Sequence, residues 1–241
     1  ADEMIAWLKK FGGEFLDYVC DVGSYLNDAA KAGKNIMFEA QLGALRDIDF
    51  GINPYTSSSN TVAAYAPVGA GVPNLKLDKV VGIMKAYSSC VGEGPYTVEA
   101  FGEFAHELRE AGGEYGAATG RPRRVGGFDV VASRYGCRMQ GADEIALTKL
   151  DVLSVFDEIP VCVAYDVNGK LVSEFPFGED LTVAKPVFEY LKGWKSDISS
   201  VRKFEDLPKE AQDYVTFIEK TVGCNIKYVS VGAERDAYIE K

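Results

Sequence analysis

Helical and strand patterns alternate along this chain, and this alternation limits the folds that are open to it. Apolar residues recur at helical spacing over 99–111 and 208–222, and short apolar runs occupy 144–148 and 226–231. Helices that alternate with short buried strands are typical of α/β proteins. The sequence therefore predicts an α/β fold with one central, mostly parallel sheet flanked by helices.

Turn and cap residues predict further boundaries. Val167-Asn-Gly169 separates two apolar runs and predicts an antiparallel hairpin, and Asp129 is placed to cap a helix that runs to about residue 139. Other expected elements are helices over 1–10, 14–31 and 61–68, strands over 35–39 and 80–91, an irregular stretch over 40–60 and a glycine-rich loop over 112–127. We expect a helical lead-in over 1–34 and one continuous α/β unit over 35–241.

Composition narrows the class of protein. The 241 residues carry a formal net charge of −10, which argues against a broad basic surface for nucleic acid. No apolar run approaches the ~18 residues of a membrane span, and the first residues lack the pattern of a signal peptide. Five scattered cysteines without a Cys-x-x-Cys pair indicate free thiols in a reducing compartment and give no basis for a zinc site. We expect a cytoplasmic protein.

A loop that ends in three arginines is unusual in so acidic a chain. Gly116 and Gly120 allow a close backbone approach, and Pro122 stiffens the segment between Arg121 and Arg123. Alternate residues of an extended segment point to opposite sides, so these two guanidinium groups can serve two different anions. The loop therefore predicts a site for small anionic ligands, with a solvated basic loop as the alternative.

Lys149 and Asp151 follow the strand predicted over 144–148. Guanine offers two adjacent donors, N1–H and the 2-amino group, and one carboxylate can accept from both. A lysine stem can lie along the base plane while its charge stays in water. Ser230 and Gly232 lie at and just beyond the end of the strand predicted over 226–231, and ligands of open α/β sheets bind beyond the carboxyl ends of strands. The pattern favours a guanine site; an ordinary solvated Lys-x-Asp pair is the alternative.

Two familiar catalytic signals are missing from these residues. No Gly-x-x-x-x-Gly-Lys-Ser/Thr loop occurs in the 241 residues. The single histidine, His106, falls in the middle of the helix predicted over 99–111, where a surface position is expected.

Several ordered motifs resemble one family, the adenylosuccinate synthetases. The resemblance runs from about Asn35 to the end and corresponds to the C-terminal part of the family, somewhat over half of it. The motifs that carry it are Asp47-Ile-Asp49-Phe-Gly, Pro54-Tyr-Thr-Ser-Ser-Ser-Asn60, Gly82-Ile-Met-Lys-Ala-Tyr87, Val91-Gly-Glu-Gly-Pro95, Gly116 to Arg124, Leu147-Thr-Lys-Leu-Asp-Val-Leu153, Cys162-Val-Ala-Tyr165 and Ser230 to Arg235. It implies a P-loop-NTPase-like ligase fold and GTP-dependent joining of IMP and L-aspartate in purine biosynthesis.

The resemblance also implies residue roles. The residues implied for GTP are Arg123, Lys149, Leu150, Asp151, Ser230, Val231 and Gly232. Those implied for IMP are Gln41, Leu42, Ser57, Val91 and Arg121, with either Gln41 or Leu42 making the contact of that segment. Those implied for aspartate are Ala117, Ala118, Thr119, Gly120, Arg121 and Arg123; Ala118 stands where many members have threonine.

The family reaction implies groups that these residues do not supply. GTP phosphorylates the 6-oxygen of IMP, and the amino group of aspartate then displaces phosphate. The catalytic aspartate and histidine, and the ligands of Mg²⁺, belong to an N-terminal part of the family that the motifs above do not include. We therefore expect no catalytic residue and no metal ligand in this chain, inactivity of the chain alone, and a homodimer for the complete enzyme.

Two other classes stay open from the sequence. One is a non-catalytic module that binds a guanine nucleotide or a dicarboxylate. The other is a fragment that mainly dimerises, for which a broad exposed apolar surface is the sign to look for.

Overall fold

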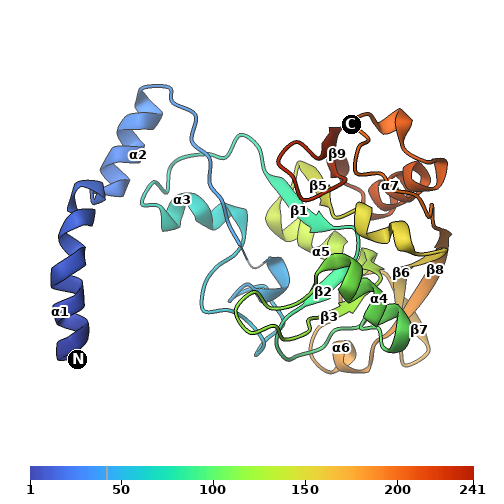
Figure 1. The fold of residues 1–241 in the computed structure, drawn as a ribbon. Coiled ribbons are helices and arrows are strands. Elements are labelled where there is room, and N and C mark those ends of the chain that lie inside the picture. Colours follow the sequence, from blue (N-terminus) through green and yellow to red (C-terminus); the bar gives the residue numbers. More distant parts are fainter. Residues whose placement is uncertain (42) are drawn as a thin grey trace. The chain divides into compact units, whose positions relative to one another are not determined.

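The computed structural model describes residues 1–41 and 43–241 (Figure 1). The chain divides into two compact units: one contains 1–40 and 64–77, and the other contains 41–63 and 78–241. The first unit thus includes two segments, 35–40 and 64–77, that were expected in the α/β part. Each unit is described by itself below.

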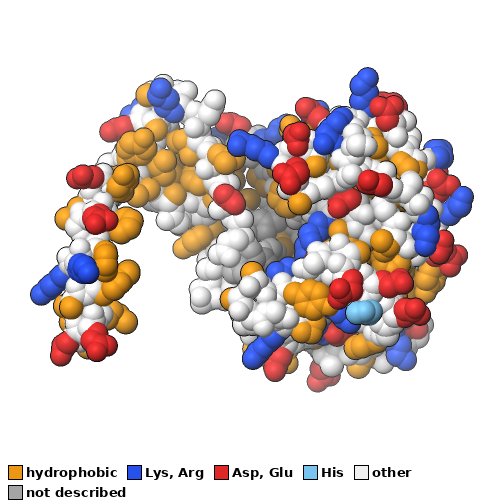
Figure 2. Space-filling model, in the orientation of Figure 1, with side chains coloured by type: hydrophobic (Ala, Val, Ile, Leu, Met, Phe, Trp, Pro, Cys, Tyr) orange, Lys and Arg blue, Asp and Glu red, His pale blue; other side chains and the backbone are white. Residues whose placement is uncertain are grey.

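The first unit is helical. It contains α1 (Asp2–Phe11), the 3₁₀ helix η1 (Gly12–Tyr18), α2 (Val22–Lys31) and the short α3 (Ala66–Gly69), which follows the 3₁₀ turn η3 (Ala63–Tyr65). The Ser24 backbone N–H donates to the Asp21 carboxylate at 3.1 Å and caps α2, and Gly33 takes a φ of 70° just after its end. Figure 2 shows hydrophobic side chains along this unit. Met4, Trp7 and Leu8 of α1 are among the exposed apolar residues.

The strand predicted over 35–39 is wrong. No residue of that segment belongs to a strand, because no described segment forms a hydrogen-bonded ladder with it. The helix predicted over 61–68 is only partly present, as a 3₁₀ turn and a single helical turn.

A four-stranded sheet carries the parallel part of the second unit. Its order is β1 (Val81–Lys85), β5 (Glu144–Thr148), β9 (Asn225–Ser230) and β10 (Tyr238–Glu240). The first three strands are parallel and β10 is antiparallel, so the carboxyl ends of β1, β5 and β9 meet at one edge. Within the described residues, β1 and β10 are the outer strands, and Val81 and Ile83 on β1 are exposed.

A second four-stranded sheet forms around the predicted hairpin. Strand β6 (Glu158–Val167) pairs with β4 (Phe128–Asp129), β7 (Lys170–Val172) and β8 (Lys185–Lys192). Asn168 and Gly169 both have positive φ, which matches the right-handed twist of the hairpin and confirms that prediction. The expectation of one main sheet is wrong, because the ten residues of β6 organise a sheet of their own.

The single strand predicted over 80–91 is two strands. The chain turns at Ala86 and Tyr87, and β2 (Ser88–Cys90) pairs with β3 (Arg124–Gly126) as a separate ribbon. Ala86 and Tyr87 are both buried, so the apolar run is continuous in sequence although the backbone is not continuous as a strand.

Three helices complete the main core: α4 (Gly102–Gly112), α5 (Val130–Gln140) and α7 (Lys209–Val222). Asp129 caps α5 as predicted, accepting from the Ala132 backbone N–H at 3.0 Å, and left-handed glycines end all three helices. Shorter elements are η2 (Ala44–Arg46), η4 (Asp151–Val155), α6 (Glu179–Val183) and η5 (Phe204–Asp206). The α/β class is therefore confirmed.

The apolar core has two parts. The larger one lies around the parallel sheet and contains Leu108, Leu147, Ile218 and Val229, all without exposed surface. The smaller one lies around β6 and contains Tyr135, Tyr165 and Phe175.

Candidate functional site

The loops that follow β5 and β9 lie side by side. The Leu150 backbone N–H donates to the Ser230 carbonyl oxygen at 3.2 Å, and the Ser230 hydroxyl donates to the Gly232 carbonyl oxygen at 2.9 Å. Lys149 takes a φ of 61°, which turns the chain away from the strand immediately after β5. Because β5 and β9 are adjacent and parallel, the structure brings together the two loops that the sequence analysis assigned to guanine.

Two of the residues expected to bind GTP point into the core. Leu150 and Val231 are fully buried, so their side chains anchor the loops and only their backbone groups can face a ligand. The Val231 backbone N–H is already used by the Ala237 carbonyl oxygen at 2.9 Å.

Asp151 carries an acceptor without a partner. Its Oδ1 atom is buried and accepts no hydrogen bond from any described residue. Burial raises the pKa of this carboxyl above its usual value, although the charge of Lys149 acts in the opposite direction. A buried acceptor left unsatisfied is unfavourable by about 1–3 kcal/mol, so the site is suited to a ligand that supplies a donor.

Glu114 lies at the centre of a charged cluster that follows α4. Its side chain is fully buried, and its carboxylate accepts from Lys85 Nζ at 2.6 Å, from Arg123 Nη1 at 3.0 Å and from the Tyr87 hydroxyl. Lys149 Nζ lies 3.5 Å from the same carboxylate and donates to the Gly112 carbonyl oxygen at 2.5 Å. Three cations thus surround one anion, which leaves a local excess of positive charge.

The protonation of Glu114 follows from this setting. Burial alone would raise the pKa of its carboxyl, but hydrogen bonds from Lys85 and Tyr87 and the charges of Lys85 and Lys149 lower the pKa to about 2. Burial also lowers the pKa of Lys85, against the influence of Glu114. We therefore treat Glu114 as ionised at neutral pH.

The arginine loop is a short hairpin. Tyr115 and Pro122 form an antiparallel bridge, and the Gly116 backbone N–H donates to the Arg121 carbonyl oxygen at 2.9 Å. Residues 117–120 form the exposed tip, where Gly120 has a φ of 63° and donates from its N–H to the Gly116 carbonyl oxygen at 2.7 Å. The tip presents Ala117, Ala118 and Thr119 to solvent, which suits a loop that receives a ligand.

The three arginines of this segment differ in their surroundings. Arg123 is half-buried against Glu114, whereas Arg121 is exposed and forms no ion pair with a described residue. Arg124 forms a bidentate pair with Glu99, at 2.9 and 2.5 Å, and donates to the carbonyl oxygens of Gly92 and Gly94. Arg124 therefore holds the 92–95 turn, and Arg121 and Arg123 remain as candidates for binding an anionic ligand.

Arg46 joins the two segments that were expected to contact IMP. Its guanidinium donates to the carbonyl oxygens of Tyr55 at 2.5 Å and of Val91 at 3.0 Å. Ser57 donates to the Arg46 carbonyl oxygen from both its backbone N–H, at 2.8 Å, and its hydroxyl, at 2.9 Å. Ser57 and the exposed Val91 are thereby held on either side of one arginine.

The remaining IMP candidates are Gln41 and Leu42. Gln41 is exposed and lies in an irregular segment, and Leu42 lies outside the described residues. The choice between the two residues stays open.

Three residues around the candidate site were not predicted from the sequence: Lys85, Glu114 and Arg46. Lys85 ends β1 at the same edge as Lys149, so the rule that ligands bind beyond strand ends could have found it. Glu114 and Arg46 act through contacts with distant segments, and no local pattern indicates such contacts.

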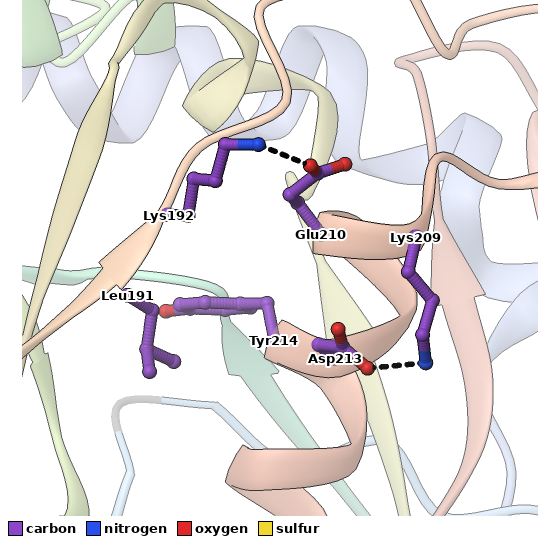
Figure 3. A pocket seen from close by; sticks show the side chains of 6 residues that line it. All are labelled: Leu191, Lys192, Lys209, Glu210, Asp213 and Tyr214. Atoms are coloured by element: carbon purple, nitrogen blue, oxygen red, sulfur yellow. Dashed lines mark hydrogen bonds and ion pairs between the residues drawn. The ribbon is translucent and has the colours of Figure 1, made fainter.

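Two cavities outside the guanine loops are notable. One of about 300 Å³ is lined by Leu191, Lys192, Lys209, Glu210, Asp213 and Tyr214, and none of the predicted site residues lines it (Figure 3). Its charges pair with one another, Lys192 with Glu210 at 2.7 Å and Lys209 with Asp213 at 2.6 Å. A second cavity, of about 290 Å³, includes Arg123 in its wall.

Other features bear on the class of site. His106 is exposed on α4, as predicted (Figure 2). Across residues 1–41 and 43–241, no group of three or more His, Cys, Asp or Glu side chains is arranged to hold a metal ion. In the same part of the chain, every helix is too short or too polar to cross a bilayer. All five cysteines are free thiols.

The fold is that of an α/β protein whose candidate site loops lie at the carboxyl edge of a parallel sheet, the arrangement of nucleotide-binding folds. The family model described as adenylosuccinate synthetase matches residues 1–239. The chain belongs to the adenylosuccinate synthetase family. The match includes residues 1–34, for which the sequence analysis found only helical character.

Named relatives agree with this assignment. The chain is 45% identical to adenylosuccinate synthetase of Bifidobacterium adolescentis, over 99% of this chain and 56% of the relative. It is 44% identical to that of Streptococcus gordonii, over 98% of this chain and 55% of the relative. The chain therefore spans about half the length of these curated relatives.

Solved structures confirm the fold. The fully ligated adenylosuccinate synthetase from Plasmodium falciparum matches with a TM-score of 0.95 and 36% identity, over 100% of this chain and 58% of that chain. A cyanophage S-2L succinoaminodeoxyadenylate synthetase matches over 90% of this chain with a TM-score of 0.56 and 17% identity, which shows a shared fold alone.

Proposed function

We propose that this chain serves the GTP-dependent ligation of IMP and L-aspartate to adenylosuccinate, a step of purine biosynthesis. Membership of the family supports the reaction. The observation that carries the site assignment is the buried, unpartnered Oδ1 atom of Asp151 at the carboxyl edge of the sheet.

In this proposal Asp151 reads the guanine base of GTP. Its carboxylate accepts from N1–H and the 2-amino group, and these donors satisfy the buried oxygen. Ser230 and Gly232 line the other side of the base, and Lys149 lies beside it with its charge held near Glu114.

The arginine loop binds the anionic groups of the other substrates. Arg123 meets the carboxylates of aspartate and lies close to the GTP phosphates, and Arg121 reaches IMP near its ribose. Residues 117–120 line the aspartate pocket with backbone N–H groups and the Thr119 hydroxyl. The exposed tip and the local excess of positive charge support this assignment.

IMP is also contacted by Ser57 and Val91, which Arg46 holds together. Gln41 or Leu42 provides a further contact. The described residues therefore bind and orient substrates, and no proton transfer is assigned to any of them.

The reaction of the family uses Mg²⁺ together with GTP. No described cluster of acidic side chains fits that ion, so we derive no step through the metal in this chain. We further propose a homodimer and a cytoplasmic location for the complete protein.

The substitution Asp151→Asn tests the guanine assignment. The asparagine amide can donate to the 2-oxo group of xanthine but cannot accept from both donors of guanine. In the complete protein, we expect kcat/KM to fall roughly a hundredfold with GTP and to rise with XTP. Asp157→Asn, at an exposed carboxylate paired with Lys195, is the matched control. An unchanged preference for GTP in Asp151→Asn would show that this assignment is wrong.

A second candidate is a guanine-nucleotide binding protein without ligase chemistry. The unpartnered Oδ1 atom of Asp151 is the observation behind it, because that atom bears on guanine binding and not on ligation. GDP binding by the complete protein without any formation of adenylosuccinate would support it over the ligase.

A further inference from the structure

Glu114 is the one described residue that forms ion pairs with both Lys149 and Arg123. Lys149 belongs to the guanine loop and Arg123 to the arginine loop. We propose that Glu114 is a positioning residue that couples these two loops, so that the binding of guanine nucleotide and the binding of aspartate depend on each other. This inference rests on the function proposed above.

The two carboxylate oxygens of Glu114 divide the cluster. Oε1 accepts from Lys85 at 2.6 Å and from the Tyr87 hydroxyl, and lies 3.5 Å from Lys149 Nζ. Oε2 accepts from Arg123 at 3.0 Å. A carboxylate is a rigid planar group, so a shift of the side chain toward one loop changes its contacts with the other.

Two hydrogen bonds to backbone carbonyl oxygens hold residues 112–114, one from each loop. The Lys149 ammonium donates to the Gly112 carbonyl oxygen at 2.5 Å, and the Arg123 backbone N–H donates to the Glu114 carbonyl oxygen at 2.9 Å. Gly113, between them, ends α4 with a φ of 59°. The end of α4 is therefore the mechanical link between the guanine loop and the arginine loop.

Arg123 is oriented but not saturated by this link. The Nη1 atom of Arg123 donates to Glu114, while the Nε atom of Arg123 is buried without a partner among the described residues. Glu114 thus fixes the plane of the guanidinium and leaves donors for an anionic ligand.

Positioning and simple charge compensation predict opposite results for Glu114→Gln. Glutamine keeps the size of the side chain and an acceptor for Tyr87 but removes the negative charge. If Glu114 only compensated charge, its loss would attract anionic substrates and lower their KM values. If it positions the loops, the KM values for aspartate and GTP both rise, by about tenfold.

The variant Glu114→Asp separates the two roles further. It keeps the charge but shortens the side chain by one methylene, so it cannot reach both loops at once. Positioning predicts raised KM values here as well, whereas charge compensation predicts values like those of the wild type. This variant also keeps the inference testable if Glu114→Gln does not fold.

Coupling is measured with Lys149→Met in the complete protein. Lys149 is assigned to guanine, yet we expect its loss to raise the KM for aspartate several-fold, and we expect this effect to disappear in the Glu114→Gln background. Calorimetry with GDP gives a readout that does not need turnover, and GDP should bind several-fold more weakly to both Glu114 variants. Glu174→Gln, which breaks the exposed pair with Arg138, is the control and should change neither value.

The outcomes separate the inference from the proposed function. A wild-type protein that neither forms adenylosuccinate nor binds GDP overturns both. A wild-type protein that does both, with unchanged or lowered KM values in Glu114→Gln and Glu114→Asp, overturns the positioning role alone. Additive effects of Lys149→Met and Glu114→Gln on the aspartate KM also overturn it.

Discussion

At the residue scale, arginines with several carbonyl partners hold the site together. Arg46 reaches the carbonyl oxygens of Tyr55, Val91 and Glu93. Arg124 donates to the carbonyl oxygens of Gly92 and Gly94 and to the Glu99 carboxylate. A planar guanidinium can make these contacts in fixed directions, whereas a lysine ammonium is a single point of charge. These residues shape the loops that are proposed to bind IMP.

The substitution Arg46→Lys is therefore expected to loosen the loops that carry Ser57 and Val91. We expect the KM for IMP to rise about tenfold while the KM for GTP stays the same, because the guanine loops do not contact Arg46. Steady-state kinetics on the complete protein measure both values. Arg134→Lys is the control, since Arg134 also donates to two carbonyl oxygens, those of Ser173 and Thr221, at a place without predicted site residues. Equal changes in both KM values would contradict a local role for Arg46.

The sequence predicted part of this site for a physical reason. Lys149 and Asp151 follow β5 and Ser230 ends β9, and the ends of parallel neighbours meet at one edge whatever the rest of the fold is. Glu114 and Arg46 were missed because their partners are distant in sequence and come together only through tertiary packing. The proposed roles in ligand binding stay predictions.

At the element scale, glycines decide how closely β3 can approach its neighbours. A Cβ atom at Gly126 would lie 1.9 Å from the Val98 carbonyl oxygen, which is closer than any real contact. A Cβ atom at Gly136, inside α5, would find only the Ala44 Cβ at 4.0 Å. One substitution, glycine to alanine, is thus forbidden in the ribbon and tolerated in the helix.

Gly126→Ala and Gly136→Ala form a matched pair. We expect Gly126→Ala to lower the free energy of unfolding by about 3 kcal/mol or more, because backbone must move to relieve the clash. We expect Gly136→Ala to raise it by up to about 1 kcal/mol, because alanine is the better helix former. Urea unfolding of both variants measures the difference, and a loss of stability in Gly136→Ala would contradict the account of α5.

In the second unit, helices were predicted better than strands because their signals are local. The cap of Asp129 on α5 and the start and end of α7 depend on residues within one turn. A strand needs a partner, and 35–39 has none among the described residues, while the run 80–91 serves two different partners. The second sheet could not be foreseen, because nothing in the sequence of β6 tells how many strands will pair with it.

At the scale of the whole molecule, buried carboxyls make stability depend on pH. Burial raises the pKa of the Asp129 carboxyl to about 6, although the Ala132 N–H and the Tyr165 hydroxyl both donate to it. Between the ordinary value of 3.8 and about 6, the folded state holds this proton and the unfolded state does not. The contribution of Asp129 to the free energy of unfolding therefore falls as the pH rises through this window and is constant above it.

The substitution Asp129→Asn removes this titration and keeps both the helix cap and a partner for Tyr165. We expect the difference in free energy of unfolding, variant minus wild type, to increase from pH 4 to pH 6 by up to about 1.4 kcal/mol per pH unit. Urea unfolding at several pH values measures it. Glu114 has the opposite effect, in a lower pH range. Because its pKa is lowered to about 2 in the folded state, it contributes stability above about pH 4.5, and this stability is lost as the pH falls toward 2. A difference that does not change between pH 4 and 6 would show that Asp129 is ionised throughout.

The position of β1 at the edge of its sheet also affects how molecules of this chain associate. Its backbone donors and acceptors on the outer side have no ladder among the described residues, and Ile83 is 70% exposed beside them. Such an edge is a template for strand pairing between molecules. Concentrated solutions of the chain by itself are therefore open to edge-to-edge aggregation, and the tendency grows wherever β1 stays uncovered.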